Sequence, residues 1–71
     1  MRFSRHAQQQ MAKRRIDADE VAQALANRET SYAGRPEGRT VVLGRTSAGR
    51  RLKVVIARDV VVTVADRDEE A

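Results

Sequence analysis

Apolar residues recur at helical spacing near the start of the chain. Ala7 and Met11 lie four residues apart, and either Arg14 or Arg15 continues the same stripe of a helix. Ser4 precedes this stripe and is favoured at helix N-caps, because its hydroxyl accepts a hydrogen bond from an otherwise unpaired backbone N–H. The pattern predicts a first helix that begins after Ser4 and ends near Arg14.

The second helix has a sharper start signal. Asp17 is followed three residues later by Glu20, the spacing of a capping box in which each side chain accepts from the backbone N–H of the other residue. Ile16 and Val21 flank this box and form the matching hydrophobic staple. We expect this helix to end near Arg28.

The second half of the chain changes to short runs of β-branched residues separated by turn signals. The expected strands are Arg39–Leu43, Arg51–Ala57 and Val60–Ala65. Connections this short join antiparallel neighbours, because a parallel crossover needs about a dozen residues or more. Thr30–Gly38 is interpreted as a connecting loop or a short edge strand around Tyr32. The pattern predicts one α+β domain over residues 1–65, with two N-terminal helices packed on a three- to four-stranded antiparallel sheet, and an acidic tail over residues 66–71.

Alternation within the strands predicts which faces meet water. In the second expected strand, Leu52, Val54 and Ile56 point to one face. Arg51 and Lys53 point to the other, so this strand is half-buried with a cationic outer face. The last strand has no polar face, which means either that it is central in the sheet or that its second face is covered by the helix pair, a homodimer partner or another protein.

Composition limits how much such a domain can bury. The 71 residues are 41% apolar and only 3% aromatic, with no Cys and no Trp. A small domain buries a smaller share of its chain than a large one, so this core must be thin and aliphatic. Disulfides and thiolate-held metals are excluded, and the composition is typical of a small cytoplasmic protein.

The charge is unevenly distributed along the chain. Fourteen basic residues against ten acidic ones give a net charge of +4. Residues 1–16 carry five cations and no acid, whereas residues 66–71 carry four acids and one Arg. A basic body indicates a polyanionic partner, most often a nucleic acid, because phosphate neutralisation supplies much of the affinity. The alternative is an Arg-rich surface that is merely solvated.

Targeting and membrane segments are not expected. The longest purely apolar run is Val54–Ala57, far short of the roughly twenty residues that span a bilayer. The first fifteen residues lack the apolar stretch of a secretory signal. Removing them as a mitochondrial presequence would leave too little chain for a core.

The side chains available for catalysis are one histidine and the cationic residues. No Walker loop, dinucleotide fingerprint or metal-ligand spacing is present, so we expect no cofactor and no metal. A metal-free ribonuclease needs a proton acceptor and cations that hold the phosphate. His6 can transfer the proton, and Arg14 lies roughly 80° around the same helix from it. We therefore predict His6 and Arg14 as catalytic residues. Arg5, Arg51 and Lys53 are predicted to bind substrate.

Each of these residues also has a structural interpretation. His6 could make a structural hydrogen bond at a helix start, and the arginines could be solvated surface. The scarcity of aromatic residues argues against a base-stacking platform.

The order of several short sequence motifs resembles the pattern of a family of small uncharacterised bacterial domains. The motifs are His6-Ala7, Met11, Arg14, Ile16, Glu20-Val21, Ala24-Leu25, Gly38-Arg39, Gly49-Arg50-Arg51-Leu52-Lys53-Val54-Val55 and Val62-Thr63-Val64. The family pattern is His-Ala-x-x-Arg-Met-x-x-Arg-Gly-Ile, an acidic-Val-x-x-Ala-Leu helix, a Gly-Arg turn and a Leu-x-Val-Val strand. The likeness extends from Ser4 to Ala65.

This family is similar in expected fold to the RelE-like and BrnT-like toxins of bacterial toxin–antitoxin pairs, which cut RNA. The resemblance implies a ribonuclease toxin held by an antitoxin partner. Two residues depart from the pattern. Gln10 stands in place of an Arg, which removes a cation from the expected site. Arg15 stands in place of the Gly that favours the left-handed conformation at the end of the first helix, a conformation that an Arg can adopt at a cost of roughly a kilocalorie per mole or more.

The sequence therefore supports two main hypotheses. The first is a toxin-like, metal-independent endoribonuclease or RNA-binding domain with an antitoxin-like partner. The alternative is a non-catalytic interaction module of the same fold that binds a protein, a nucleic acid or a second copy of the chain. A DNA-binding regulator ranks last, because the second helix is short and acidic at its start.

Overall fold

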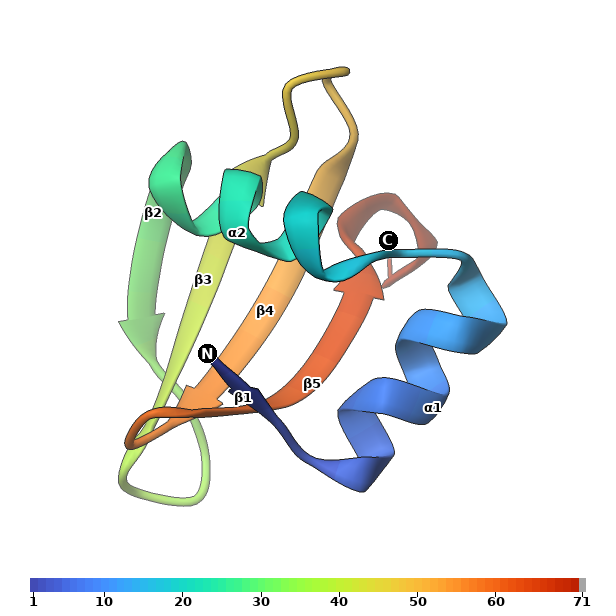
Figure 1. Cartoon of the computed structure of the whole chain (residues 1–71). Helices are drawn as coiled ribbons and strands as arrows, with labels where there is room; N and C mark the ends of the chain where they lie inside the picture. Colours follow the sequence, from blue (N-terminus) through green and yellow to red (C-terminus); the bar gives the residue numbers. More distant parts are fainter. Residues whose placement is uncertain (71) are drawn as a thin grey trace.

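A five-stranded mixed sheet carries two α-helices on one face (Figure 1). The computed structural model describes residues 1–70, with side chains for residues 1–68. The elements are β1 (Arg2–Phe3), α1 (Arg5–Arg14), α2 (Ala18–Ala26), β2 (Arg28–Ala33), β3 (Arg39–Arg45), β4 (Arg51–Ala57), β5 (Val60–Asp66) and the 3-10 helix η1 (Arg67–Glu70). The strand order is β1-β5-β4-β3-β2, and only the β1–β5 pair is parallel.

Both helices begin at the N-caps that the sequence predicts. The Ser4 hydroxyl accepts from the Ala7 N–H at 3.1 Å. Asp17 and Glu20 form the complete capping box, with bonds of 2.8 and 3.1 Å. Arg15 ends α1 in the left-handed conformation, with φ 56° and ψ 50°.

The α+β class with two helices is confirmed, but the predicted sheet is not. The sheet has five strands rather than three or four, and it is mixed rather than purely antiparallel. β1 escaped the prediction because two residues carry no periodicity. β2 is the edge strand around Tyr32 that is one of the two interpretations of Thr30–Gly38, but it begins at Arg28 and its six residues are all exposed.

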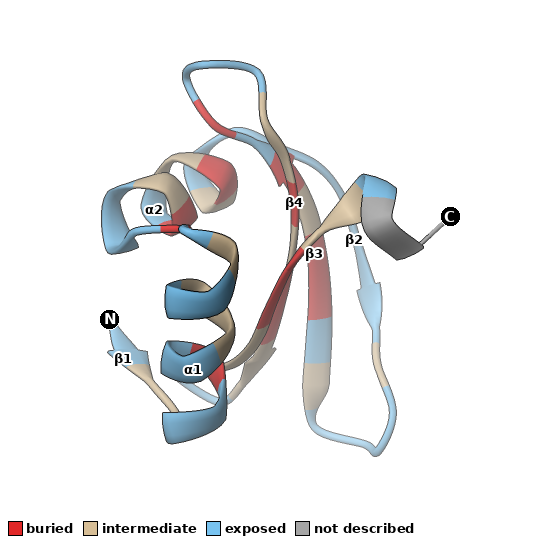
Figure 2. Ribbon diagram, turned by 90° about the vertical axis from the view of Figure 1, so that its right-hand side faces the viewer, coloured by how far each residue is buried: buried red, intermediate tan, exposed pale blue. Residues whose placement is uncertain are grey.

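The core lies between the helices and one face of the sheet (Figure 2). Its buried members are Ala7, Ile16, Val21, Ala24, Leu52, Val54, Val61 and Val64. Val61 and Val64 are three residues apart, which a regular strand would place on opposite faces. Ile56 pairs with Val61 whereas Val55 pairs with Thr63, so β5 carries one extra residue, a β-bulge, between them. The bulge lets two valines of β5 reach the core.

Helix α1 covers the part of β5 that β1 leaves unpaired. The Ser4 N–H donates to the Val61 carbonyl at 2.8 Å, which directs the chain from β1 into the helix. Six residues further along, the Gln10 Oε1 atom accepts from the Val64 N–H at 3.0 Å. Gln10 therefore has a structural role, because it joins α1 to β5.

Arg50 ties α1, α2 and β5 together from the turn between β3 and β4. Its guanidinium donates to both carboxylate oxygens of Asp66, at 2.7 and 2.9 Å. It also donates to the carbonyl oxygens of Arg14 at 2.9 Å and Arg15 at 3.0 Å. Glu20 of the capping box lies 3.5 Å from the same group. Asp66, assigned by the sequence to the acidic tail, thus belongs to β5 and to this network, while Ala71 lies outside the described residues.

Gly44 of β3 lets α2 approach the sheet. A Cβ atom at this position would overlap the carbonyl group of Ala24 and would lie 3.1 Å from the Asn27 carbonyl oxygen. Backbone atoms of a packed helix cannot yield as a flexible side chain can. Only glycine therefore permits this distance between α2 and β3.

No helix among residues 1–70 has the length and apolar character needed to cross a membrane. Within the same residues, His, Asp and Glu side chains do not gather in a group that could hold a metal ion.

Replacing Gly44 tests the close approach of α2. We expect Gly44→Ala to lower the free energy of unfolding by about 1–3 kcal/mol, the usual cost of overpacking. Urea denaturation followed by circular dichroism measures this change. Ser47→Ala, in the exposed β3–β4 turn, is the control and should stay within about 0.5 kcal/mol of wild type. Equal stability of Gly44→Ala and wild type would contradict the close packing of α2 on β3.

The Arg50–Asp66 pair predicts a dependence of stability on pH. The hydrogen bonds from Arg50 hold the pKa of Asp66 below its ordinary value of 3.8. A carboxylate with a lowered folded-state pKa stabilises the fold above its unfolded pKa, and this stabilisation is lost as pH falls through the folded pKa. Asp66→Asn should therefore be less stable than wild type at pH 7, by about 1–2 kcal/mol, and the difference should shrink below pH 4.

Thermal unfolding of both proteins between pH 7 and pH 2 measures this difference. Asp59→Asn removes an exposed carboxylate at the other end of β4 and should keep the wild-type pH dependence. A constant difference between wild type and Asp66→Asn at every pH would show that the ion pair does not contribute.

Candidate nucleic-acid interface

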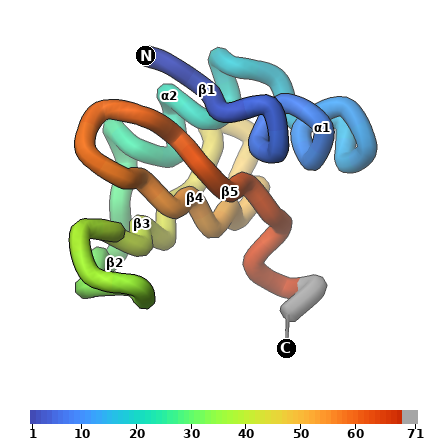
Figure 3. The backbone as a smooth tube through the Cα atoms, turned by 90° about the horizontal axis from the view of Figure 1, so that it is seen from below, coloured from blue at the N-terminus to red at the C-terminus, as the bar shows by residue number. Residues whose placement is uncertain are grey.

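The face of the sheet that carries no helix is called the open face. Cross-strand partners share a face, so Val41, Val55 and Thr63 lie together on it, opposite the core valines. Figures 2 and 3 show both helices on one side of the strands. The loop after β2 and the start of η1, which we call the C-terminal turn, lie on the other side. These two segments flank the open face.

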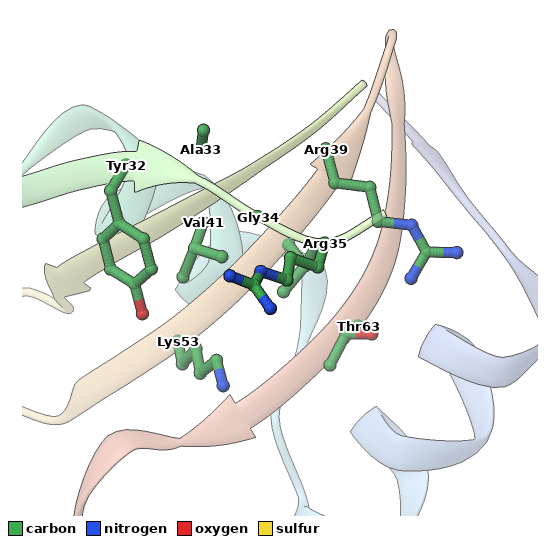
Figure 4. A pocket seen from close by; sticks show the side chains of 9 residues that line it. Tyr32, Ala33, Gly34, Arg35, Arg39, Val41, Lys53 and Thr63 are labelled. Atoms are coloured by element: carbon green, nitrogen blue, oxygen red, sulfur yellow. The ribbon is translucent and has the colours of Figure 1, made fainter. Parts of the chain in front are cut away.

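The open face is hollowed between β2 and β5. The hollow has a volume of about 430 Å³, and Figure 4 shows the side chains around it. We call it the sheet hollow; it is lined by Tyr32, Ala33, Gly34, Arg35, Arg39, Val41, Lys53, Val55 and Thr63. Val41 and Val55 are buried and form its apolar floor. The rim of the sheet hollow is therefore polar, and its apolar floor is part of the sheet.

The rim of the sheet hollow is cationic. Arg35 comes from the loop after β2, Arg39 from β3 and Lys53 from β4, and none of the nine lining residues is acidic. The Tyr32 side chain stands at the β2 side and is half exposed. In Figure 4 the Arg35 guanidinium is directed toward Tyr32, whereas that of Arg39 is directed away from it.

These groups suit a phosphorylated ligand. Guanidinium groups bind phosphate through paired N–H donors, and an ammonium adds a positive point charge. The Thr63 hydroxyl can donate or accept a hydrogen bond. An exposed tyrosine ring offers a face on which one base can stack.

A second, smaller hollow lies on α1. It has a volume of about 300 Å³ and is lined by His6, Gln9, Gln10, Lys13 and Arg14. We call it the helix hollow. His6 is exposed in the first turn of α1, and Arg14 is in the last. The structure therefore brings the two residues predicted to be catalytic to one hollow.

The residues predicted to bind substrate are not gathered in that hollow. Lys53 lines the sheet hollow. Arg51 is on the open face, and its Nη1 atom lies 3.6 Å from Asp68 of η1. Arg5 is exposed at the start of α1 and lines neither hollow. The predicted constellation is thus divided between the helix hollow and the open face.

Arg51 is incompletely satisfied. Among the described side chains, its Nε atom is the buried polar atom that has no hydrogen-bond partner. The side chain as a whole is about one-third exposed. Arg51 therefore stands at the edge of the open face with part of its side chain exposed and its Nε atom buried.

Sequence reasoning missed four residues of the sheet hollow: Tyr32, Arg35, Arg39 and Thr63. Arg39 had a usable signal, because it precedes Val41 by two residues and so shares its face. Arg35 had none, since it lies in a loop without periodicity.

Comparison with known proteins identifies a family. A model described as a domain of unknown function (DUF4258) matches residues 3–66. No curated protein and no solved structure matches the chain. The match confirms the expectation of an uncharacterised domain family, and it extends from β1 to the end of β5. Over nearly its whole length, from the strand that opens the sheet to the aspartate that binds Arg50, the chain belongs to the DUF4258 family.

Proposed function

We propose that this domain binds single-stranded RNA through the sheet hollow. The observation that carries the proposal is the rim of Arg35, Arg39 and Lys53, three cations from separate elements with no carboxylate among the lining residues. The choice of RNA and of a toxin–antitoxin setting rests on the resemblance to RelE-like toxins, whose fold we propose for this chain. Tyr32 and the basic rim support an unpaired strand, because a base can reach the ring only when it is free of a duplex.

Phosphate contacts supply most of the affinity in this proposal. Arg35 and Arg39 hold backbone phosphates at the rim, and Lys53 adds charge from the middle of the sheet. Tyr32 stacks against one base and contributes little sequence preference, since every base presents a π-face. Binding should accordingly be strongly salt-dependent and weakly sequence-specific.

Neutralising the rim tests this proposal. The double variant Arg35→Gln/Arg39→Gln should bind a short fluorescein-labelled single-stranded RNA roughly tenfold more weakly, because glutamine cannot neutralise the charge of a phosphate. The dependence of log K on log salt should also become shallower, by about 0.7 for each phosphate that is no longer neutralised. Fluorescence anisotropy titrations at several salt concentrations measure both effects.

A matched control removes the same charge from a different place. Arg15 and Arg28 lie outside the hollow on the helix side; Arg15 is exposed at the end of α1, and the Nε atom of Arg28 donates to the Leu25 carbonyl. The double variant Arg15→Gln/Arg28→Gln should retain most of the affinity. Equal weakening by the two double variants would indicate general electrostatics, and no binding by wild type would reject the proposal.

Ribonuclease activity at the helix hollow is a second candidate function. It is favoured by the grouping of His6 with Lys13 and Arg14. In such a reaction the RNA 2′-oxygen bonds to phosphorus while the bond to the 5′-oxygen breaks. His6 takes the 2′-hydroxyl proton, water protonates the leaving oxygen, and the two cations stabilise the charge that develops on the phosphorane. The products are a 2′,3′-cyclic phosphate and a 5′-hydroxyl end.

Substitution of His6 tests this activity. Induced wild-type protein should arrest growth and cleave transcripts, and His6→Ala should lower cleavage about a hundredfold or more, the usual contribution of a general base. Gln9→Ala removes another side chain of the same hollow and should keep the activity. Intact transcripts with wild-type protein would exclude the ribonuclease and leave RNA binding as the function.

A further inference from the structure

The acidic C-terminal turn lies against the cationic open face. Asp68 of η1 is 3.6 Å from the Nη1 atom of Arg51. Arg67 donates to Glu29 of β2 at 3.1 Å, and the other oxygen of Glu29 accepts from Arg45 of β3 at 2.8 Å. These five residues form a charge row that extends from η1 to β2 across the open face.

The charge row adjoins the sheet hollow. Arg51 and Lys53 are two residues apart in β4 and therefore lie on the same face, and Lys53 lines the hollow. Arg45 pairs with Arg51 across the strands, so the cationic surface continues from the rim of the hollow to the end of the sheet. Carboxylates of Glu29 and Asp68 occupy this end.

We propose that the C-terminal turn is an intramolecular competitor of RNA. An RNA strand held in the sheet hollow and continuing along β4 would place its next phosphate at Arg51, where the Asp68 carboxylate now lies. This inference rests on the proposed RNA binding and adds a regulatory contact to it. In the free protein the Asp68 carboxylate of the turn lies at Arg51. In the complex an RNA phosphate takes its place.

The Asp68 contact is suited to release. Its carboxylate is 77% exposed and lies 3.6 Å from Arg51, beyond hydrogen-bond distance. Exposed pairs of this kind contribute little net free energy and are screened by salt.

Asp66, the last residue before the C-terminal turn, limits how far the turn can move. Asp66 accepts two hydrogen bonds from Arg50 and remains part of the sheet. Arg67 is the first residue beyond this anchor, and its bond to Glu29 holds the turn across the open face. Displacement of Asp68 therefore requires movement only after residue 66.

Removing the Asp68 charge tests the competition. In the full chain, Asp68→Asn should tighten binding of the fluorescein-labelled single-stranded RNA about two- to fivefold at low salt, the range expected for an exposed ion pair. The gain should vanish at high salt. Asp19→Asn makes the same change of net charge in the first turn of α2 and should have a smaller effect.

A double-mutant cycle assigns the effect to Arg51. In the Arg51→Gln background, Asp68→Asn should no longer tighten binding. A gain that persists in that background, or an equal gain from Asp19→Asn, would overturn the competition while leaving RNA binding intact.

The ion pair itself has a readout that needs no RNA. The Arg51 Nε–Hε resonance should shift in Asp68→Asn and not in Asp19→Asn. This shift without RNA binding by any of the proteins would reject the proposed function and, with it, the competition. Binding by wild type without the shift would reject the competition alone.

Discussion

One guanidinium group holds the helical layer to the sheet. Arg50 binds the Asp66 carboxylate, the carbonyls of Arg14 and Arg15, and Glu20 of the α2 capping box. The buried core residues are aliphatic and Phe3 packs at their edge, so these directional bonds add to apolar packing in fixing the orientation of the helices. Because the donors are satisfied by carboxylates and helix-end carbonyls, the cost of partly burying the charge is offset. The ends of α1, α2 and β5 thereby meet at one point.

This arrangement separates two groups of cations. Arg50 binds within the fold on the helix side, whereas Arg35 and Arg39 stand on the rim of the sheet hollow. The helices cover one face of the sheet and leave the other face open. Counting the arginines in the sequence cannot distinguish the two groups.

Local signals predicted local structure well. The Asp17–Glu20 capping box and the Ser4 cap depend on neighbours in the chain, and the structure contains both. The β5 bulge and the reach of Arg50 to Asp66 depend on residues brought together by folding. The spacing of residues along the chain does not reveal such long-range contacts. For the same reason Arg14 and Lys53, which the sequence predicted in one site, line different hollows.

The parallel pairing of β1 with β5 has a consequence for how the chain acquires its structure. Phe3 pairs with Val61, so the first strand finds its neighbour only in the last one. Helix α1 likewise packs mainly on β5. β1 and α1 therefore gain their partner in the sheet only when β5 is in place, whereas α2 can pack on β3 and β4 before it. Closing the long loop between β1 and β5 costs entropy before their contacts form, so this pairing is expected to be a late step of folding.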